Sequence, residues 1–104
     1  MKNLLIALVL AAVPMTSTTL LAGDPAAGQA AYAVCSACHG QKGEGNKMFN
    51  APKIAGQHAW YTVASLQAYK AGTRTGPIAA TMAPMATMLD DKKMADLAAY
   101  IETL

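Results

Sequence analysis

A C-x-x-C-H pattern at positions 35–39 combines residue types and a spacing that could do chemistry. Two thiols three residues apart lie on one side of a helical turn, where both can reach the two vinyl groups on one edge of a porphyrin. The next residue, His39, is then held where its imidazole can bind iron. The pattern is typical of covalent haem attachment, and it predicts that Cys35 and Cys38 form thioethers to one haem c.

Two other uses of the cysteine pair have no support elsewhere in the sequence. A redox-active disulfide of the thioredoxin type requires a βαβ context, and no convincing strand pattern is present. A zinc site requires further ligands, but the chain has no second cysteine pair, and His58 alone could not complete the set. Haem attachment therefore remains the interpretation of the pair.

An iron that only carries electrons needs a second protein ligand, and three methionines are candidates. Met82, Met85 and Met88 cluster in segment 72–89, which contains glycine and proline breakers and is predicted to be irregular. A methionine in a loop could turn its sulfur inward without leaving a helix stripe. His58 is the other candidate, but it is close in sequence to the proximal ligand and is better interpreted as a surface histidine.

The first element that must position these residues is a helix predicted for 24–37. Asp24 is a plausible N-cap and Pro25 suits the first helical position. Gly28 lowers stability within a helix, so it indicates that another backbone passes close by. The apolar face is expected to contain Ala27, Ala31 and Val34, with Tyr32 on its flank.

Two further helices follow. One is predicted for 57–71 with Gly72 as its stop, and the last begins near residue 90 and runs to the chain end. The apolar stripe of the last helix contains Met94, Leu97, Ala98 and Ile101. The segments between helices, including 40–56, are expected to be loops. Loops this long in a small domain indicate that something packs inside them, as a haem would.

The N-terminal segment 1–22 has the organisation of a secretory signal peptide. Lys2 supplies a positive start, the run 4–13 is apolar, and Ala22 is a small residue at the expected cleavage site, which could move by a few residues. The apolar run is about half of the roughly 20 residues that a membrane-spanning helix needs, so an uncleaved anchor is the weaker alternative. One domain, 23–104, is expected to remain after export to the periplasm.

Size and charge restrict what this domain can do. A domain this small is only marginally stable without disulfides, a metal or a cofactor. A disulfide between two cysteines close in sequence would add little stability. Removing Lys2 from the eight basic residues leaves seven against six acidic residues. This near-neutral balance argues against nucleic acid binding, which needs a concentrated basic surface.

Segment 23–104 resembles the small bacterial class I c-type cytochromes, and especially one half of the two-haem members. The matching motifs are Gly28 with Tyr32 before the haem motif, and the stretches 35–40, 52–57, 66–72, 82–85 and 97–101. The resemblance implies an all-α fold of short helices and loops wrapped around one covalently bound haem.

The resemblance also implies roles for particular residues. The distal ligand would be Met82, the first methionine of an M-x-x-M pair, with Met85 as the alternative. The carbonyl of Pro52 would accept a hydrogen bond from the His39 ring, which fixes the ring and raises its basicity. Arg74 would pair with a haem propionate, although a solvated surface arginine is an equal alternative.

Two further implications concern packing. Gly28 would let the first helix cross the last near Leu97 and Tyr100. Trp60 and Tyr61 are expected to pack rather than to relay electrons.

The expected function is that of a monomeric periplasmic electron carrier with His/Met ligation, which passes single electrons between redox protein partners. With both axial positions of the iron filled, no site for a small-molecule substrate remains, and the protein is not expected to be an enzyme. Contact with a membrane is expected only through membrane-bound partners. The alternative is an electron-transfer subunit of a periplasmic oxidoreductase complex.

Overall fold

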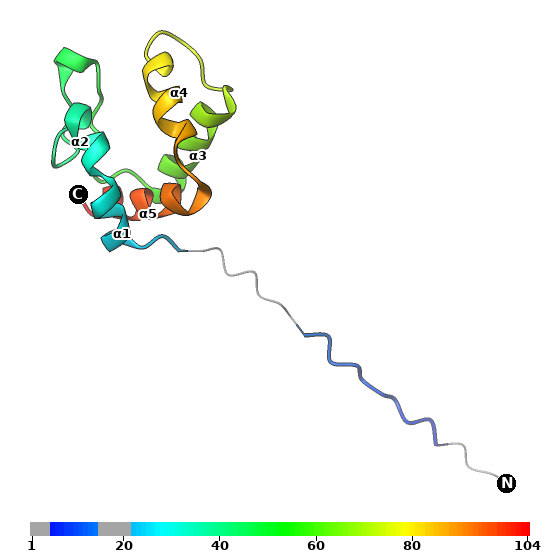
Figure 1. Cartoon of the computed structure of the whole chain (residues 1–104). Helices are drawn as coiled ribbons and strands as arrows, with labels where there is room; N and C mark the ends of the chain where they lie inside the picture. Colours follow the sequence, from blue (N-terminus) through cyan, green and yellow to red (C-terminus); the bar gives the residue numbers. More distant parts are fainter. Residues whose placement is uncertain (1–4, 15–21) are drawn as a thin grey trace.

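The computed structural model describes residues 5–14 and 22–104, and in this part of the chain it has helices and no strands (Figure 1). The all-α prediction is therefore confirmed. Beyond the helices, one isolated bridge joins Asn46 and Ala51. The helices are α1 (Pro25–Ala31), α2 (Ala33–His39), α3 (Ala59–Ala71), α4 (Ala79–Thr87) and α5 (Asp91–Glu102), with a single 3-10 turn, η1 (Lys47–Phe49).

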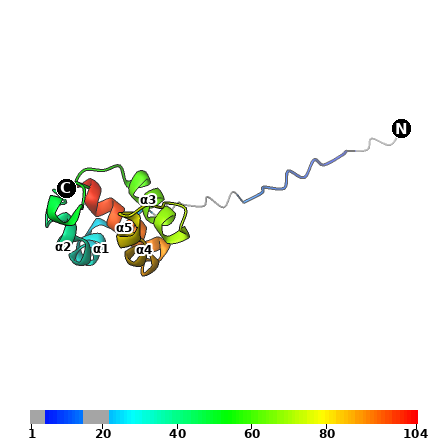
Figure 2. The same ribbon diagram turned by 90° about the horizontal axis from the view of Figure 1, so that it is seen from above.

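Helix α5 lies at the centre of the helix packing. Helices α1 and α3 both pack against α5, and α4 packs against α3. The views from the front and from above show α1 and α2 on one side of α5 and α3 and α4 on the other (Figures 1 and 2). The helices therefore form two arms, α1 with α2 and α3 with α4, which face each other across α5.

The apolar stripe predicted for the last helix forms the core. Met94, Leu97, Ala98 and Ile101 are all buried, and the last helix begins as expected, with the Asp90 side chain capping the backbone N–H of Lys93. Leu97 and Ile101 pack with Tyr32 from the first arm.

Gly28 is the point where the first helix crosses α5. A Cβ atom there would lie 1.9 Å from the carbonyl oxygen of Asp96 and 2.8 Å from Cβ of Tyr100. The expected close approach of the two backbones is present, and only glycine allows it.

The prediction of one continuous first helix is wrong. The Asp24 cap and the first-position Pro25 are present, but the helix is divided at Tyr32 into α1 and α2. The side chain assigned to the flank, Tyr32, is 3% exposed, whereas Val34, assigned to the apolar face, is 58% exposed. A single helical periodicity therefore assigned Tyr32 to the wrong side. Val34, although exposed, lines a cavity together with Ala31, as the predicted apolar face requires.

The prediction of an irregular segment 72–89 is also wrong over part of its length, because α4 forms there. Pro84 lies inside this helix. It lacks the N–H that would bond to the carbonyl four residues earlier, but the helix is short and its other residues are mostly alanine, methionine and threonine. Met82 therefore lies on a helix and not in a loop.

Helix α3 starts two residues later than expected, after His58, and Gly72 ends it in a left-handed conformation. His58 is exposed, as expected of a surface histidine. The expectation that Trp60 packs in the domain is wrong, since its side chain is 71% exposed. Tyr61 is 44% exposed but lines a cavity, and its ring meets that of Trp60 edge to face. Both lie in the first turn of α3, which contributes no buried residue.

The described part of segment 1–22 is separate from the helical domain. Residues 5–14 have no helix and their side chains are exposed. Positions 1–4 and 15–21, on which the rest of the signal-peptide prediction falls, lie outside the described residues. None of the helices in the described ranges has the length and apolar character needed to cross a membrane.

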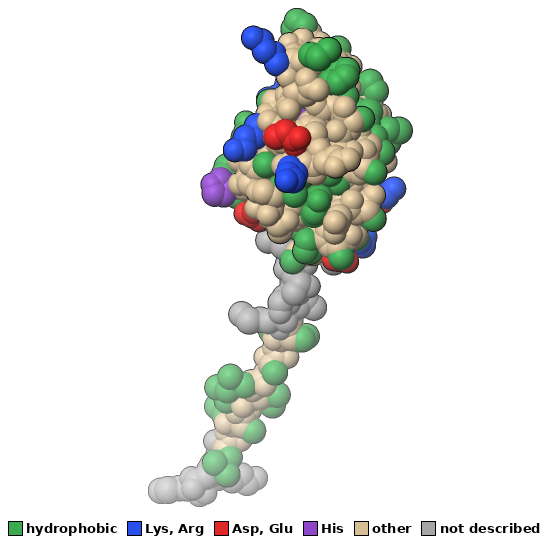
Figure 3. Space-filling view, turned by 90° about the vertical axis from the view of Figure 1, so that its left-hand side faces the viewer, with side chains coloured by type: hydrophobic (Ala, Val, Ile, Leu, Met, Phe, Trp, Pro, Cys, Tyr) green, Lys and Arg blue, Asp and Glu red, His purple; other side chains and the backbone are tan. Residues whose placement is uncertain are grey.

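Charged side chains show no concentration of one sign on the face drawn in Figure 3. Lysine and arginine are interspersed there with aspartate and glutamate. This agrees with the near-neutral charge balance of the domain.

Candidate functional site

Two adjoining cavities lie between the arms of the molecule. Their volumes are about 510 Å³ and about 420 Å³, within the usual range of cofactor pockets. Both cavities are lined mainly by apolar atoms. Five residues line both of them and so mark their junction: His39, Pro52, Tyr69, Arg74 and Met82.

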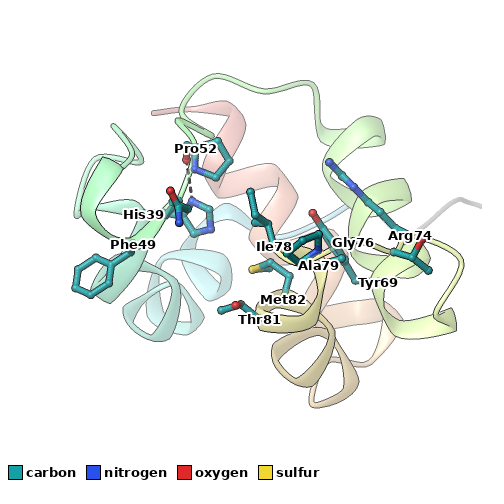
Figure 4. A pocket seen from close by; sticks show the side chains of 14 residues that line it. His39, Phe49, Pro52, Tyr69, Arg74, Gly76, Ile78, Ala79, Thr81 and Met82 are labelled. Carbon is teal, nitrogen blue, oxygen red and sulfur yellow. Dashed lines mark hydrogen bonds between the residues drawn. The ribbon is translucent and has the colours of Figure 1, made fainter.

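His39 is a buried histidine at the end of α2, and its ring is fixed by one hydrogen bond. Its Nδ1 lies 2.8 Å from the carbonyl oxygen of Pro52, the contact that the resemblance implied (Figure 4). Because a carbonyl oxygen can only accept, Nδ1 must carry the proton, and Nε2 is left with a free lone pair. This is the tautomer that a metal-binding imidazole needs.

The two cysteines lie on α2 in the turn before His39, and both are half-buried. Cys35 lines the larger cavity, whereas Cys38 is not among its lining residues. Burial, and to a smaller extent the neighbouring Cys38, raises the pKa of the Cys35 thiol. Burial, followed by the effect of Cys35, also raises the pKa of the Tyr32 hydroxyl.

The three candidate methionines occupy different positions around the cavities. Met82 lines both cavities, whereas Met85 and Met88 line only the larger one. In Figure 4 the sulfur of Met82 points toward the side of the pocket that carries His39. Helix α4 thus presents Met82 opposite α2, although the helix itself was not predicted.

Arg74 places a positive charge at the junction of the two cavities. Its guanidinium lies over the ring of Tyr69, 4.7 Å from the ring centroid. Lys53 and Lys93 also line the larger cavity, and no aspartate or glutamate of the described chain lines either one. Tyr69 lies in the stretch 66–72 that carries the family resemblance, but the sequence analysis assigned it no role beside Arg74.

These residues fit a haem. The cavity offers an imidazole nitrogen from one arm, a thioether sulfur from the other, and a cysteine thiol in the wall, which are haem-attachment and iron-binding groups. The basic residues of the lining could hold the carboxylates of haem propionates.

Comparison with known proteins also indicates a haem-binding protein. The family model described as Cytochrome c matches residues 25–104. Cytochrome c-554(548) of Halomonas halodenitrificans is 47% identical over 79 residues, which cover 76% of this chain and 94% of that protein. Cytochrome c4 of Pseudomonas aeruginosa is 42% identical over 100 residues, which cover 96% of this chain and 47% of cytochrome c4.

A solved structure agrees with these matches. Reduced recombinant cytochrome c4 from Pseudomonas stutzeri aligns with a TM-score of 0.70 at 29% identity, covering 77% of this chain and 47% of that one. The chain thus spans about half the length of the cytochrome c4 proteins it matches. It belongs to the cytochrome c family as a monohaem class I member, an electron carrier and not an enzyme, with haem c bound covalently to Cys35 and Cys38.

Proposed function

We propose that this protein is a periplasmic carrier of single electrons whose haem iron is held by His39 and Met82. When bound, the haem supplies an iron that alternates between the ferrous and ferric states. The protein residues bind the cofactor, set its electronic properties and exclude water. With two protein ligands on the iron, no position remains for a substrate.

The observation that carries the ligand proposal is the junction of the two cavities. His39 from α2 and Met82 from α4 both line this junction, whereas neither Met85 nor Met88 lines the smaller cavity. His58 lines neither cavity, so it has no access to an iron placed there.

Pro52 and Arg74 complete the proposed site. The Pro52 carbonyl fixes the tautomer of His39 and makes the imidazole a stronger electron donor. Arg74 holds a haem propionate, and Tyr69 supports the guanidinium by stacking. A charge-assisted pair of this kind also orients the cofactor edge.

In this proposal residues 1–22 act as a cleaved signal peptide, and the start of the domain supports a boundary there. The backbone N–H of Asp24 donates to Oδ1 of Asp96 at 2.8 Å. A Cβ atom on Gly23 would lie 1.9 Å from the carbonyl oxygen of Ala95, so this residue already packs on α5. Mass spectrometry of the exported protein should show a start at or near Gly23, and an intact segment 1–22 would instead support a membrane-anchored form.

A free carrier and a subunit of an oxidoreductase complex would use the same haem site. We propose the free carrier, with which the match over 94% of the length of cytochrome c-554(548) is compatible. Size exclusion of a native periplasmic extract tests this choice. A carrier elutes as a small monomer that carries haem absorbance, whereas a subunit elutes with its complex.

A further inference from the structure

The buried Tyr32 side chain connects the core of the domain to the residue that follows His39. Its ring is 3% exposed and packs with Leu97 and Ile101. Its hydroxyl donates to the carbonyl oxygen of Gly40 at 2.6 Å. We propose that Tyr32 is a positioning residue, whose hydroxyl holds the His39 imidazole in its ligand orientation. This inference rests on the proposed role of His39 as an iron ligand.

The hydrogen bond of Tyr32 anchors the start of a loop that returns to His39. Gly40 ends α2 with a φ of +89°, where the chain turns away from the helix. The N–H of Gly45 then donates to the carbonyl oxygen of His39 at 2.7 Å. The loop continues to Pro52, whose carbonyl accepts the hydrogen bond from the His39 ring. The Tyr32 hydroxyl therefore anchors one end of the loop that carries this carbonyl, together with the N–H of Gly43, which donates to the same Gly40 carbonyl at 3.1 Å.

Core packing does not require the hydroxyl. The Tyr32 ring meets the Tyr100 ring edge to face, with centroids 5.3 Å apart, and a phenylalanine could make the same contact. A buried hydroxyl adds the requirement of a partner, because leaving it unpaired costs free energy. Here the partner belongs to the residue next to His39, so the hydroxyl acts on the loop and not on the core.

The test compares Tyr32→Phe with Tyr100→Phe in the ferrous holoprotein. Tyr100 is the matched control, because it is the ring partner of Tyr32 and its hydroxyl makes no hydrogen bond among the described residues. NMR gives the solvent exchange rate of the His39 Nδ1–H, with the backbone N–H of Leu97 as a reference for global opening. Tyr32→Phe should speed exchange at His39 by about tenfold relative to Leu97, since one hydrogen bond is worth about a decade in an equilibrium constant. Tyr100→Phe should leave the ratio unchanged.

Equal acceleration at His39 and Leu97 in Tyr32→Phe would overturn the proposal, since Tyr32 would then contribute only to stability. Exchange rates that are unchanged at both His39 and Leu97 would overturn it as well. Failure of the underlying ligand assignment looks different. In that case the His39 ring protons of the wild-type protein would lack the shift that a nearby haem ring current causes, whatever their exchange rates.

Discussion

Met82 and Met85 lie about one helical turn apart on α4, and they differ in the space they line. Met82 borders both cavities together with His39, whereas Met85 borders only the larger cavity. A thioether sulfur is a soft ligand that, paired with histidine, gives haem iron a high reduction potential. In the proposed site, this one side chain would determine both the ligation of the iron and the reduction potential.

Met82→Ala should remove the weak ferric absorption band at the red end of the spectrum that reports an iron–sulfur bond. The variant should also have a lower reduction potential and bind cyanide or carbon monoxide, because a coordination position is opened. Met85→Ala is the matched control and should keep the band, with a loss of about 2 kcal/mol in the free energy of unfolding. Absorption spectra and redox titrations of both variants measure these effects.

The reverse pattern, with the band lost in Met85→Ala and kept in Met82→Ala, would exchange the roles of the two methionines. If neither variant loses the band and His58→Ala alters the spectrum, the iron is held by two histidines. The high-potential carrier would then be excluded.

At the scale of elements, the crossing of α1 and α5 depends on Gly28. Gly28→Ala would place a methyl group 1.9 Å from the carbonyl oxygen of Asp96, so the two helices must move apart. We expect a loss of about 2–3 kcal/mol in the free energy of unfolding, as for other overpacked sites. Denaturant unfolding of the holoprotein measures it.

Gly72→Ala provides the comparison for that variant. No atom lies within 4 Å of a Cβ at this position, but its φ is +75°. The cost is then backbone strain alone, about 1 kcal/mol. A smaller effect for Gly28→Ala than for Gly72→Ala would contradict a tight helix crossing.

Asp96 ties the start of the domain to α5 and makes stability depend on pH. The hydrogen bond from Lys92 and, second, that from the backbone N–H of Asp24 lower the pKa of this carboxyl. Its stabilising effect is therefore complete above the ordinary carboxyl pKa of about 4. It is lost as the pH falls through the lower pKa of the folded state.

Asp96→Asn should flatten the dependence of unfolding free energy on pH in this acid range. At neutral pH the variant should be less stable than the wild type, because the ion pair with Lys92 is lost. Thermal unfolding at a series of pH values checks both effects. An unchanged acid profile would show that other carboxyls dominate the acid transition.

The sequence predicted the elements whose local signals agree with their tertiary environment. The Asp24 cap, the Gly72 stop and the apolar stripe of α5 all appear in the structure. The divided first helix and the helical α4 were not predicted. The helix divides at Tyr32, whose side chain packs in the core. At Pro84 the packing of α4 against α3 offsets the helix destabilisation caused by proline.

The site, like the fold, could be predicted only in part from the sequence. The cysteines and His39 form a local motif, so their roles follow from spacing. Met82 is separated from that motif by more than forty residues, and nothing local distinguishes it from Met85. Tyr32 and Tyr69 lie in stretches that carry the family resemblance, but the sequence does not show their contacts with Gly40 and Arg74, because these depend on how the arms and the loop after α2 pack.

At the scale of the whole molecule, the two arms enclose a cavity where a protein without a cofactor would have a core. The buried cluster of Tyr32, Leu97 and Ile101 lies at the base, so the haem must supply much of the apolar contact between the arms.

The haem should stay with the protein in acid acetone, because thioethers hold it. Cys35→Ala and Cys38→Ala should each give little holoprotein, and their apoprotein should be largely unfolded by circular dichroism. Haem extracted freely from the wild-type protein would contradict covalent attachment.

An optically monitored redox titration of the purified protein tests whether one haem is held by His39 and Met82. We expect a single one-electron transition at high potential, with the iron–sulfur band present in the ferric form and absent after reduction. A ferric form without that band and with a low-potential midpoint would contradict His39 and Met82 as the ligand pair. Two resolved transitions would contradict a single haem.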